Sequence, residues 1–200
     1  MVSARTTTTT ALLEGLGDPR NEAVWREFDD RYRPIIVGFL KKLGFGNDDA
    51  ADLTQDTLIR VVQDYRAGKY DRQRGRLRSW IIGIVKYRVA DLRRARAKRR
   101  EWRGDSVIAE LPDDNRLTAV WEVERKRAIL RQAIAELRDQ SKLNEKAIHA
   151  FERYVLQERP ATEVARDLGL TPHDVYMAKS HVAARLREIL ARFETLFDDG

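Results

Sequence analysis

Apolar residues recur every three or four positions along most of the chain, and no stretch shows the alternation of period two that marks a half-buried strand. The first strong pattern starts at Glu22, is interrupted near Pro34 and ends at Gly44 and Gly46. We expect one or two amphipathic helices there. The Thr-rich stretch Thr6–Thr10 has no periodicity and predicts a flexible tail.

Two more helices follow in the N-terminal half of the chain. One begins at Asn47 or Asp48, either of which can cap its first turn, and continues to about Tyr65. The other runs from about Leu77 to Arg100, after a glycine-containing loop. Both helices keep their apolar residues on one face, so they can share a core. The inward residues are Leu53, Thr57 and Val61 in the first helix and Ile81, Ile84, Val85 and Leu92 in the second.

The helical pattern lapses over residues 102–116, where Gly, Asp, Asn, Ser and Pro gather. This composition is typical of a linker, and we place a domain boundary there. Beyond it we expect further helices, the first with Val123, Leu130 and Ile134 among its inward residues. The predicted fold class is all-α, with a flexible N-terminal tail (1–21), a first helical domain (22–101), a linker (102–116) and a second helical domain (117–200).

Residues 162–175 carry the sharpest local pattern. A short apolar helix ends at Gly169, which can take the left-handed conformation that closes helices. Thr171 is a good N-cap for the next helix, Pro172 suits its first position, and Asp174 complements the exposed amides of its first turn. A tight turn followed by a capped helix is typical of a helix-turn-helix, whose second helix enters the major groove of DNA. The alternative is an ordinary helical hairpin.

Positive charge is concentrated in one segment. Between Arg66 and Arg103 the chain carries fifteen Lys or Arg side chains against three acids, a local net charge of +12. The whole chain has a net charge of +6, so the remaining residues carry −6. Trp80 and Tyr87 are among the aromatics in this segment. Such a pattern is typical of nucleic-acid binding with stacking on unpaired bases. A solvated basic helix face or a membrane-surface helix would carry the same charge.

Several classes of function lack the residues they need. The sequence has no Cys, which excludes disulfides, thiolate metal sites and cysteine nucleophiles. His173 and His181 have no partners at metal-ligand spacing, so we expect no metal and no cofactor. We find no nucleotide-binding glycine loop and no nucleophile paired with a base, so no catalytic residue is expected. No apolar stretch approaches the roughly 20 residues of a membrane span, and we expect a cytoplasmic protein without membrane insertion.

The order of these features resembles one family. Residues 49–56, with the sequence Asp-Ala-Ala-Asp-Leu-Thr-Gln-Asp, are similar to the family segment Asp-Ala-Glu-Asp-Leu-x-Gln-Glu. Residues 78–81 and 91–94 follow at the family's spacing, and the helix-turn-helix with residues 185–187 completes the pattern. From about residue 25 to residue 190, the chain resembles a bacterial extracytoplasmic function (ECF) sigma factor of the sigma-70 family, the promoter-specificity subunit of RNA polymerase.

The resemblance implies that the first domain is sigma region 2 and the second is sigma region 4. Side chains three, seven and fourteen positions after Asp49 share one helix face, which in the family docks on the clamp helices of the largest polymerase subunit. Without the resemblance, a solvated acidic face is the simpler interpretation. The implied core-polymerase contacts are Asp49, Asp52, Leu53, Gln55, Asp56, Arg60 and Gln63.

The resemblance also implies two DNA contacts. Residues 69–76 resemble the family's specificity loop, which takes up a base flipped from the non-template strand, and the next helix would hold the melted minus-ten strand. Trp80 is equally compatible with a core position. The implied minus-ten contacts are Lys69, Tyr70, Arg72, Arg74, Arg76, Trp80, Lys86, Tyr87, Arg88, Arg93 and Arg94. The implied minus-35 contacts are Thr171, His173, Asp174, Tyr176, Met177, Lys179, Ser180, His181 and Arg185.

The sequence departs from the family pattern at three places. Ala51 stands where the family usually has an acid, which predicts weaker polymerase binding or a charge supplied by a partner or modification. Phosphorylation of Thr54 or Thr57 is one hypothesis for that charge. Tyr87 replaces a usual Asn, and residues 176–178 replace a basic, small, basic run, so the promoter preference of relatives does not transfer.

The sequence therefore predicts a sigma factor that directs transcription of a stress- or signal-responsive regulon, without catalytic activity. Its implied partners are core RNA polymerase, through the clamp helices and the flap, and promoter DNA. An anti-sigma factor or a Ser/Thr kinase would regulate it, and the sequence identifies neither. Two alternatives are a stand-alone helix-turn-helix regulator of duplex DNA and an RNA-binding or antitermination protein.

Overall fold

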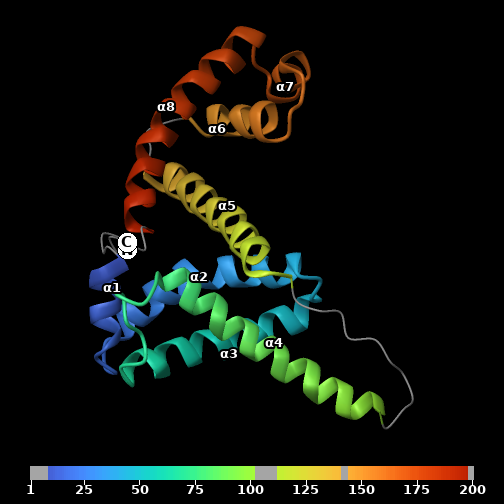
Figure 1. Cartoon of the computed structure of the whole chain (residues 1–200). Helices are drawn as coiled ribbons and strands as arrows, with labels where there is room; N and C mark the ends of the chain where they lie inside the picture. The colour runs from blue at the N-terminus through green and yellow to red at the C-terminus, as the bar shows by residue number, and fades with distance from the viewer. Residues whose placement is uncertain (1–8, 102–111, 141–143, 198–200) are drawn as a thin grey trace. The chain divides into compact units, whose positions relative to one another are not determined.

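All elements of the described residues are helical (Figure 1), which confirms the predicted all-α class. The structure is a computed structural model that describes residues 9–101, 112–140 and 144–197. The helices are α1 (Thr9–Leu16), α2 (Glu22–Lys42), α3 (Asn47–Arg66), α4 (Leu77–Glu101), α5 (Asp114–Gln140), α6 (Glu145–Phe151), the π-helical turn η1 (Glu152–Leu156), α7 (Ala161–Leu168) and α8 (Pro172–Leu196).

The chain divides into two compact units. The first contains the described residues up to Ala128 together with Phe197, and the second is Ile129–Leu196. The division between the two units falls inside α5, and most of the predicted linker, residues 102–116, lies outside the described residues. The physical reason is Trp121, whose side chain is buried in the first unit with its ring centroid 5.7 Å from that of Phe39 in α2. A large apolar ring stabilises the unit that encloses it.

In the first unit, α3 packs against both α2 and α4 (Figure 1). The apolar spacing of α3 explains this arrangement, because its buried residues recur every three or four positions and form one stripe. The stripe is Leu53, Thr54, Thr57, Leu58, Val61 and Val62. The opposite side of α3 is left for solvent.

α2 is one helix, although Pro34 lies in its middle. Proline has no backbone N–H and removes one helical hydrogen bond. Ile35 and Ile36, directly after it, are fully buried, which stabilises the helix by about 2 kcal/mol each. Arg33 also donates two hydrogen bonds to Asp29 across the same turn, at 2.7 and 2.6 Å. Packing and this ion pair outweigh the missing bond.

Residues 9–16 form α1, where the sequence predicts a flexible tail. Leu12, Leu13 and Leu16 are buried, and α1 packs against α2 and α3. Arg66 donates from Nε to the backbone oxygen of Leu16 at 2.9 Å and so satisfies an end of this short helix. Long-range burial orders a segment that is too short to be a stable helix alone.

The start of α3 differs from the prediction by one residue. Gly46 is the N-cap, in an extended conformation and without a side-chain hydrogen bond to the helix, and neither Asn47 nor Asp48 caps it. Asp48 and Asp49 lie in the first turn instead. There they complement the positive end of the helix dipole.

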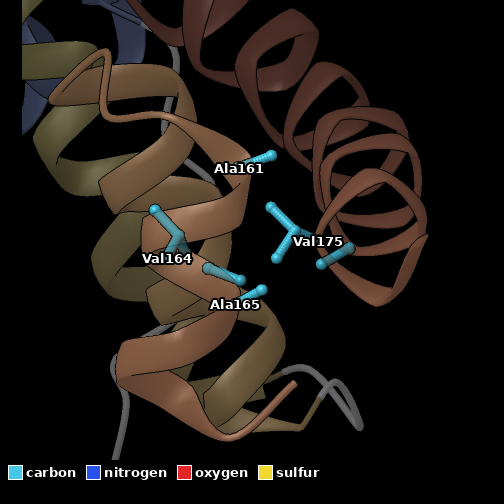
Figure 2. Close-up of a cluster of buried hydrophobic side chains, with 6 residues drawn as sticks. Ala161, Val164, Ala165 and Val175 are labelled. Atoms are coloured by element: carbon cyan, nitrogen blue, oxygen red, sulfur yellow. The ribbon is translucent and has the colours of Figure 1, made fainter. Parts of the chain in front are cut away.

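The second unit has the predicted helix-turn-helix. α7 ends at Gly169, whose φ of 63° and ψ of 43° are left-handed, and α8 starts at Pro172. Figure 2 shows Ala161 and Ala165 of α7 pointing toward Val175 of α8, and Val164 belongs to the same buried cluster. These small side chains let the two helices approach closely, because none carries a long or polar group.

We expect Gly169→Ala to lower the free energy of unfolding by about 1–2 kcal/mol, because a Cβ is unfavourable in the left-handed conformation. No atom lies within 4 Å of the new Cβ, so the cost comes from the backbone alone. Gly83→Ala is the matched control. It has the same open surroundings inside α4 and should stabilise the protein by about 1 kcal/mol. Urea unfolding measures both, and equal effects would contradict the conformational explanation.

Candidate nucleic-acid interface

α3 presents an acidic face to solvent, defined here as Asp49, Asp52, Asp56 and Gln63. Asp52, Asp56 and Gln63 are exposed, and Asp49 is half-buried. Gln55 is exposed beside this face and accepts a hydrogen bond from Arg33 of α2 at 2.6 Å. The acidic face is therefore open to a partner, with one of its neighbours held in place.

Burial decides the role of three residues of α3. Leu53 is 5% exposed and belongs to the core, as its inward place in the apolar pattern predicts, so its side chain is not available for the implied contact with core polymerase. Thr54 and Thr57 are fully buried, and their hydroxyls donate to the backbone oxygens of Ala50 and Leu53 at 2.6 and 2.7 Å. Both hydroxyls are enclosed in this fold, so neither is accessible to a kinase.

Two charged side chains at the edges of α3 already form ion pairs. Asp49 accepts a hydrogen bond from Arg96 of α4 at 2.5 Å. Arg60, predicted as a contact, is half-buried and donates to Asp64 at 2.8 Å, while Lys69 donates to the other oxygen of Asp64 at 2.9 Å. Burial alone would raise the pKa of Asp64, but the hydrogen bonds from Lys69 and Arg60 lower it below its usual value. This carboxylate is held ionised.

Ile59 is an exposed apolar residue of α3 that is absent from the contacts predicted from the sequence. It lies in α3 four positions from both Gln55 and Gln63, so it shares their side of the helix, and it is 41% exposed. An exposed apolar side chain surrounded by polar ones is typical of a protein contact. The helical spacing was the signal that could have found it.

The basic helix, α4, carries cations that are already paired with acids. Lys86 donates to Asp114 at 2.7 Å. Arg78 donates to Glu122 at 2.6 Å and is not among the DNA contacts predicted from the sequence. Asp114 and Glu122 both belong to α5, within the first unit. The first turns of α5 therefore supply carboxylates to the cationic helix.

Most of the other Arg side chains predicted to contact the minus-ten strand already have partners within the first unit. Arg88 and Arg94 both reach Asp91, at 3.5 and 2.6 Å. Arg93 lies over the ring of Phe45 at 5.9 Å. In the loop, Arg72 donates to the Thr10 hydroxyl at 2.8 Å, Arg74 pairs with Asp71 at 3.4 Å, and Arg76 is exposed. Most of these pairs are exposed, so they are weak and can exchange for a phosphate.

Three aromatic rings from the end of α3, the following loop and the start of α4 make tilted contacts. Tyr70 lies between Tyr65, with ring centroids 6.2 Å apart, and Trp80, at 4.9 Å. Tyr70 and Trp80 are both half-buried, so Trp80 is neither enclosed in the core nor a free platform. Burial first and the charge of Glu14 second raise the pKa of Tyr65. Tyr87 lies seven positions after Trp80 in α4, and its ring is 73% exposed.

In the second unit, every residue predicted to contact duplex DNA is exposed: Thr171, His173, Asp174, Tyr176, Met177, Lys179, Ser180, His181 and Arg185. Thr171 and Asp174 form a capping box. The Thr171 backbone N–H and hydroxyl donate to the Asp174 carboxylate at 2.9 and 2.7 Å, and the Asp174 N–H donates to the Thr171 hydroxyl oxygen at 3.1 Å. These two residues fix the start of α8.

Two exposed residues of α8, Tyr176 and Lys179, contact Tyr154, which the sequence pattern does not single out. Tyr154 of η1 packs edge-on against Tyr176, with ring centroids 5.7 Å apart at 85°, and Lys179 lies 5.6 Å above the Tyr154 ring. Ser180 donates to the backbone oxygen of Tyr176 at 3.2 Å, and Arg185 pairs with Glu188 at 2.5 Å. Tyr154 is 22 positions from Tyr176 in the sequence, so no local pattern identified it.

Metal binding and membrane insertion would each need features other than these. Within residues 9–101, 112–140 and 144–197, no three His, Asp or Glu side chains are grouped so that they could hold a metal ion. No helix in the part of the chain that the structure describes is both long and apolar enough to span a membrane.

An acidic helix face beside a basic aromatic helix, with a separate helix-turn-helix unit, defines a class of DNA-binding protein that also docks on a protein partner. Residues 28–100 match the family model for Sigma-70 region 2. The chain is 33% identical over 164 residues to the ECF RNA polymerase sigma factor RpoE of Cereibacter sphaeroides, which covers 80% of this chain and 82% of that protein. The chain belongs to the ECF RNA polymerase sigma factors, and it acts in transcription initiation.

We expect Asp174→Asn to lower the melting temperature at neutral pH. The hydrogen bonds from the Thr171 hydroxyl and N–H lower the pKa of Asp174, so the folded state favours the ionised carboxylate. This stabilisation is complete above the ordinary Asp pKa of about 3.9 and is lost as the pH falls through the lower folded value. Melting curves by circular dichroism between about pH 7 and pH 2 should show the two proteins converging below about pH 4.

Glu194→Gln, an exposed acid near the other end of α8, is the control and should leave the melting temperature at pH 7 unchanged. A deficit of Asp174→Asn that stays constant over the whole pH range would contradict the role of its charge.

Proposed function

We propose that the chain recruits core RNA polymerase through the acidic face of α3. Asp52 and Asp56 provide exposed charge for basic side chains of a partner helix, and Gln55, Gln63 and Ile59 extend the contact. An apolar centre with a charged rim is the usual composition of a protein interface. Asp49 would join it at the edge, where it is shared with Arg96.

The basic helix α4 and the loop before it would hold the minus-ten region as a single strand. The cations of this helix meet phosphates, and the exposed ring of Tyr87 stacks on an unpaired base. The loop with Tyr70 supplies the place for a flipped base. Opening the duplex then needs no nucleotide hydrolysis, since trapped bases hold the strands apart, and the protein itself catalyses no reaction.

The helix-turn-helix would bind the minus-35 duplex, with α8 in the major groove. Tyr176, Met177, Lys179 and His181 are exposed in its first turns, where a recognition helix contacts base edges. This function is supported above all by one observation: an exposed acidic face and a basic aromatic helix lie on adjacent, packed helices of one unit. A regulator that binds only duplex DNA would use neither surface.

Run-off transcription tests this function. Core polymerase with the full chain should give a transcript that depends on the promoter sequence, and core polymerase alone should give none. Templates come from mapping transcription start sites after overexpression of the chain. Tight operator binding without any polymerase-dependent transcript would favour a stand-alone regulator, and transcript-specific binding to RNA would favour an antitermination protein.

We expect the double substitution Asp52→Asn with Asp56→Asn to weaken binding to core polymerase by about three- to tenfold, because exposed ion pairs contribute up to about 1 kcal/mol each. Asp139→Asn, an exposed acid of the second unit, should leave the affinity unchanged. Fluorescence anisotropy of labelled chain with purified core enzyme measures both. Equal affinities for the double variant and the wild type would remove the acidic face from the proposal.

We expect Ala51→Glu to strengthen binding to core polymerase by about two- to fivefold. Ala51 is exposed in α3 beside Asp52, so a carboxylate there adds charge to the docking surface without disturbing the core. The same anisotropy titration measures it, with Ala51→Gln as the neutral control of similar size. An unchanged affinity would end the idea that Ala51 weakens docking.

A further inference from the structure

Tyr154 lies in η1, a π-helical turn directly after α6. The turn is closed by the Gln157 N–H, which donates to the backbone oxygen of Glu152 five residues earlier at 3.0 Å. A π-helical turn inserts a residue into the helical repeat and so changes which side chains face a neighbouring helix, and such turns are frequent at functional sites. Here the side chain that reaches α8 is Tyr154.

One ring of Tyr154 contacts two residues that lie three positions apart on the recognition helix. Its contact with Tyr176 is edge-on, with ring centroids 5.7 Å apart, and the Lys179 ammonium lies 5.6 Å from the ring centroid. Both geometries are favourable for an aromatic ring, whose face is negative and whose edge is positive. Tyr176 is still 50% exposed, so the contact orients its side chain without removing it from solvent.

The backbone around Tyr154 is fixed from two sides. Glu152 accepts two hydrogen bonds from Arg138 at 2.7 Å, and Arg153 lies 3.6 Å from Asp167 of α7. An orienting side chain must itself be held in place, and these ion pairs hold the turn that carries it.

Packing alone does not account for a tyrosine at this position. The buried cluster under it consists of Ala and Val side chains, and Tyr154 is only half-buried at the edge of that cluster. An aliphatic side chain would fill the same edge. Only an aromatic ring makes both the edge-on contact with Tyr176 and the cation contact with Lys179.

We propose that Tyr154 is a positioning residue for promoter recognition: it holds Tyr176 and Lys179 of α8 in the orientation in which they contact the minus-35 base pairs. This inference rests on the proposed function of the helix-turn-helix. Tyr154 itself touches no DNA. It restricts the rotamers of two flexible side chains before binding, and preorganised side chains discriminate better between base pairs than mobile ones.

The test is selection of duplexes by the full chain bound to core polymerase, from a library randomised over the upstream promoter half. Wild type, Tyr154→Leu, Tyr154→Phe and Leu156→Ala are compared. Leu156 is an exposed residue of the same turn and serves as the matched control. We expect Tyr154→Leu to lose about three- to tenfold of its discrimination at the one or two base pairs contacted by Tyr176 and Lys179. Affinity for an unrelated duplex should not change.

Tyr154→Phe keeps the ring and should select the wild-type motif. Leu156→Ala should select the same motif. A wild type that selects no upstream motif would overturn the proposed function and this inference with it. A selective wild type whose motif is unchanged in Tyr154→Leu would overturn this inference alone. A uniform loss of affinity for all duplexes would also overturn it, because that result indicates a merely structural role.

A double-mutant cycle with Tyr176→Ala adds an independent measurement. If Tyr154 acts through Tyr176, adding Tyr154→Leu to Tyr176→Ala causes no further loss at the base pair that Tyr176 contacts. Additive losses there would contradict the inference. Should Tyr154→Leu melt below the assay temperature, Tyr154→Met replaces it, because an unbranched thioether fills the same edge without an aromatic ring.

Discussion

The functional surfaces of the first unit depend on the burial of one stripe of α3 between α2 and α4. Leu53, Leu58 and Val61 turn inward, and the rotation of the helix that this burial fixes leaves Asp52 and Asp56 in solvent. The same packing sets α4 directly beside α3. Because the helix has 3.6 residues per turn, the apolar contacts determine where every charge points. The proposed docking face is thus a consequence of core packing.

The parts of the fold that follow from local chemistry were predictable from the sequence. Gly169 takes the left-handed conformation, and Thr171 and Asp174 form the capping box, as their residue types and spacing indicate. The single helices and the exposed recognition residues follow from apolar periodicity. These features need information from fewer than about ten neighbouring residues, which is the range that turn and capping rules cover.

What the sequence did not predict depends on contacts between distant residues. Trp121 joins the first unit because Phe39 meets it, and Val123, predicted to be inward, is 48% exposed. Thr54 has a polar side chain, yet it is fully buried because its hydroxyl finds the backbone oxygen of Ala50. The contact of Tyr154 with α8 requires a π-helical turn. Helical periodicity describes one element at a time, and each of these outcomes is decided by a second element.

The carboxylates that α5 supplies to α4 change what an ionic-strength experiment reports. A lysine that neutralises a phosphate releases cations condensed on the DNA, and that release makes binding steeply dependent on salt. In the proposed complex, Lys86 would first give up the tethered carboxylate of Asp114, and Arg78 that of Glu122. The carboxylates freed by such an exchange attract cations from solution, which offsets part of the release from the DNA. The slope of affinity against salt concentration would therefore count fewer phosphates than the proposed interface touches.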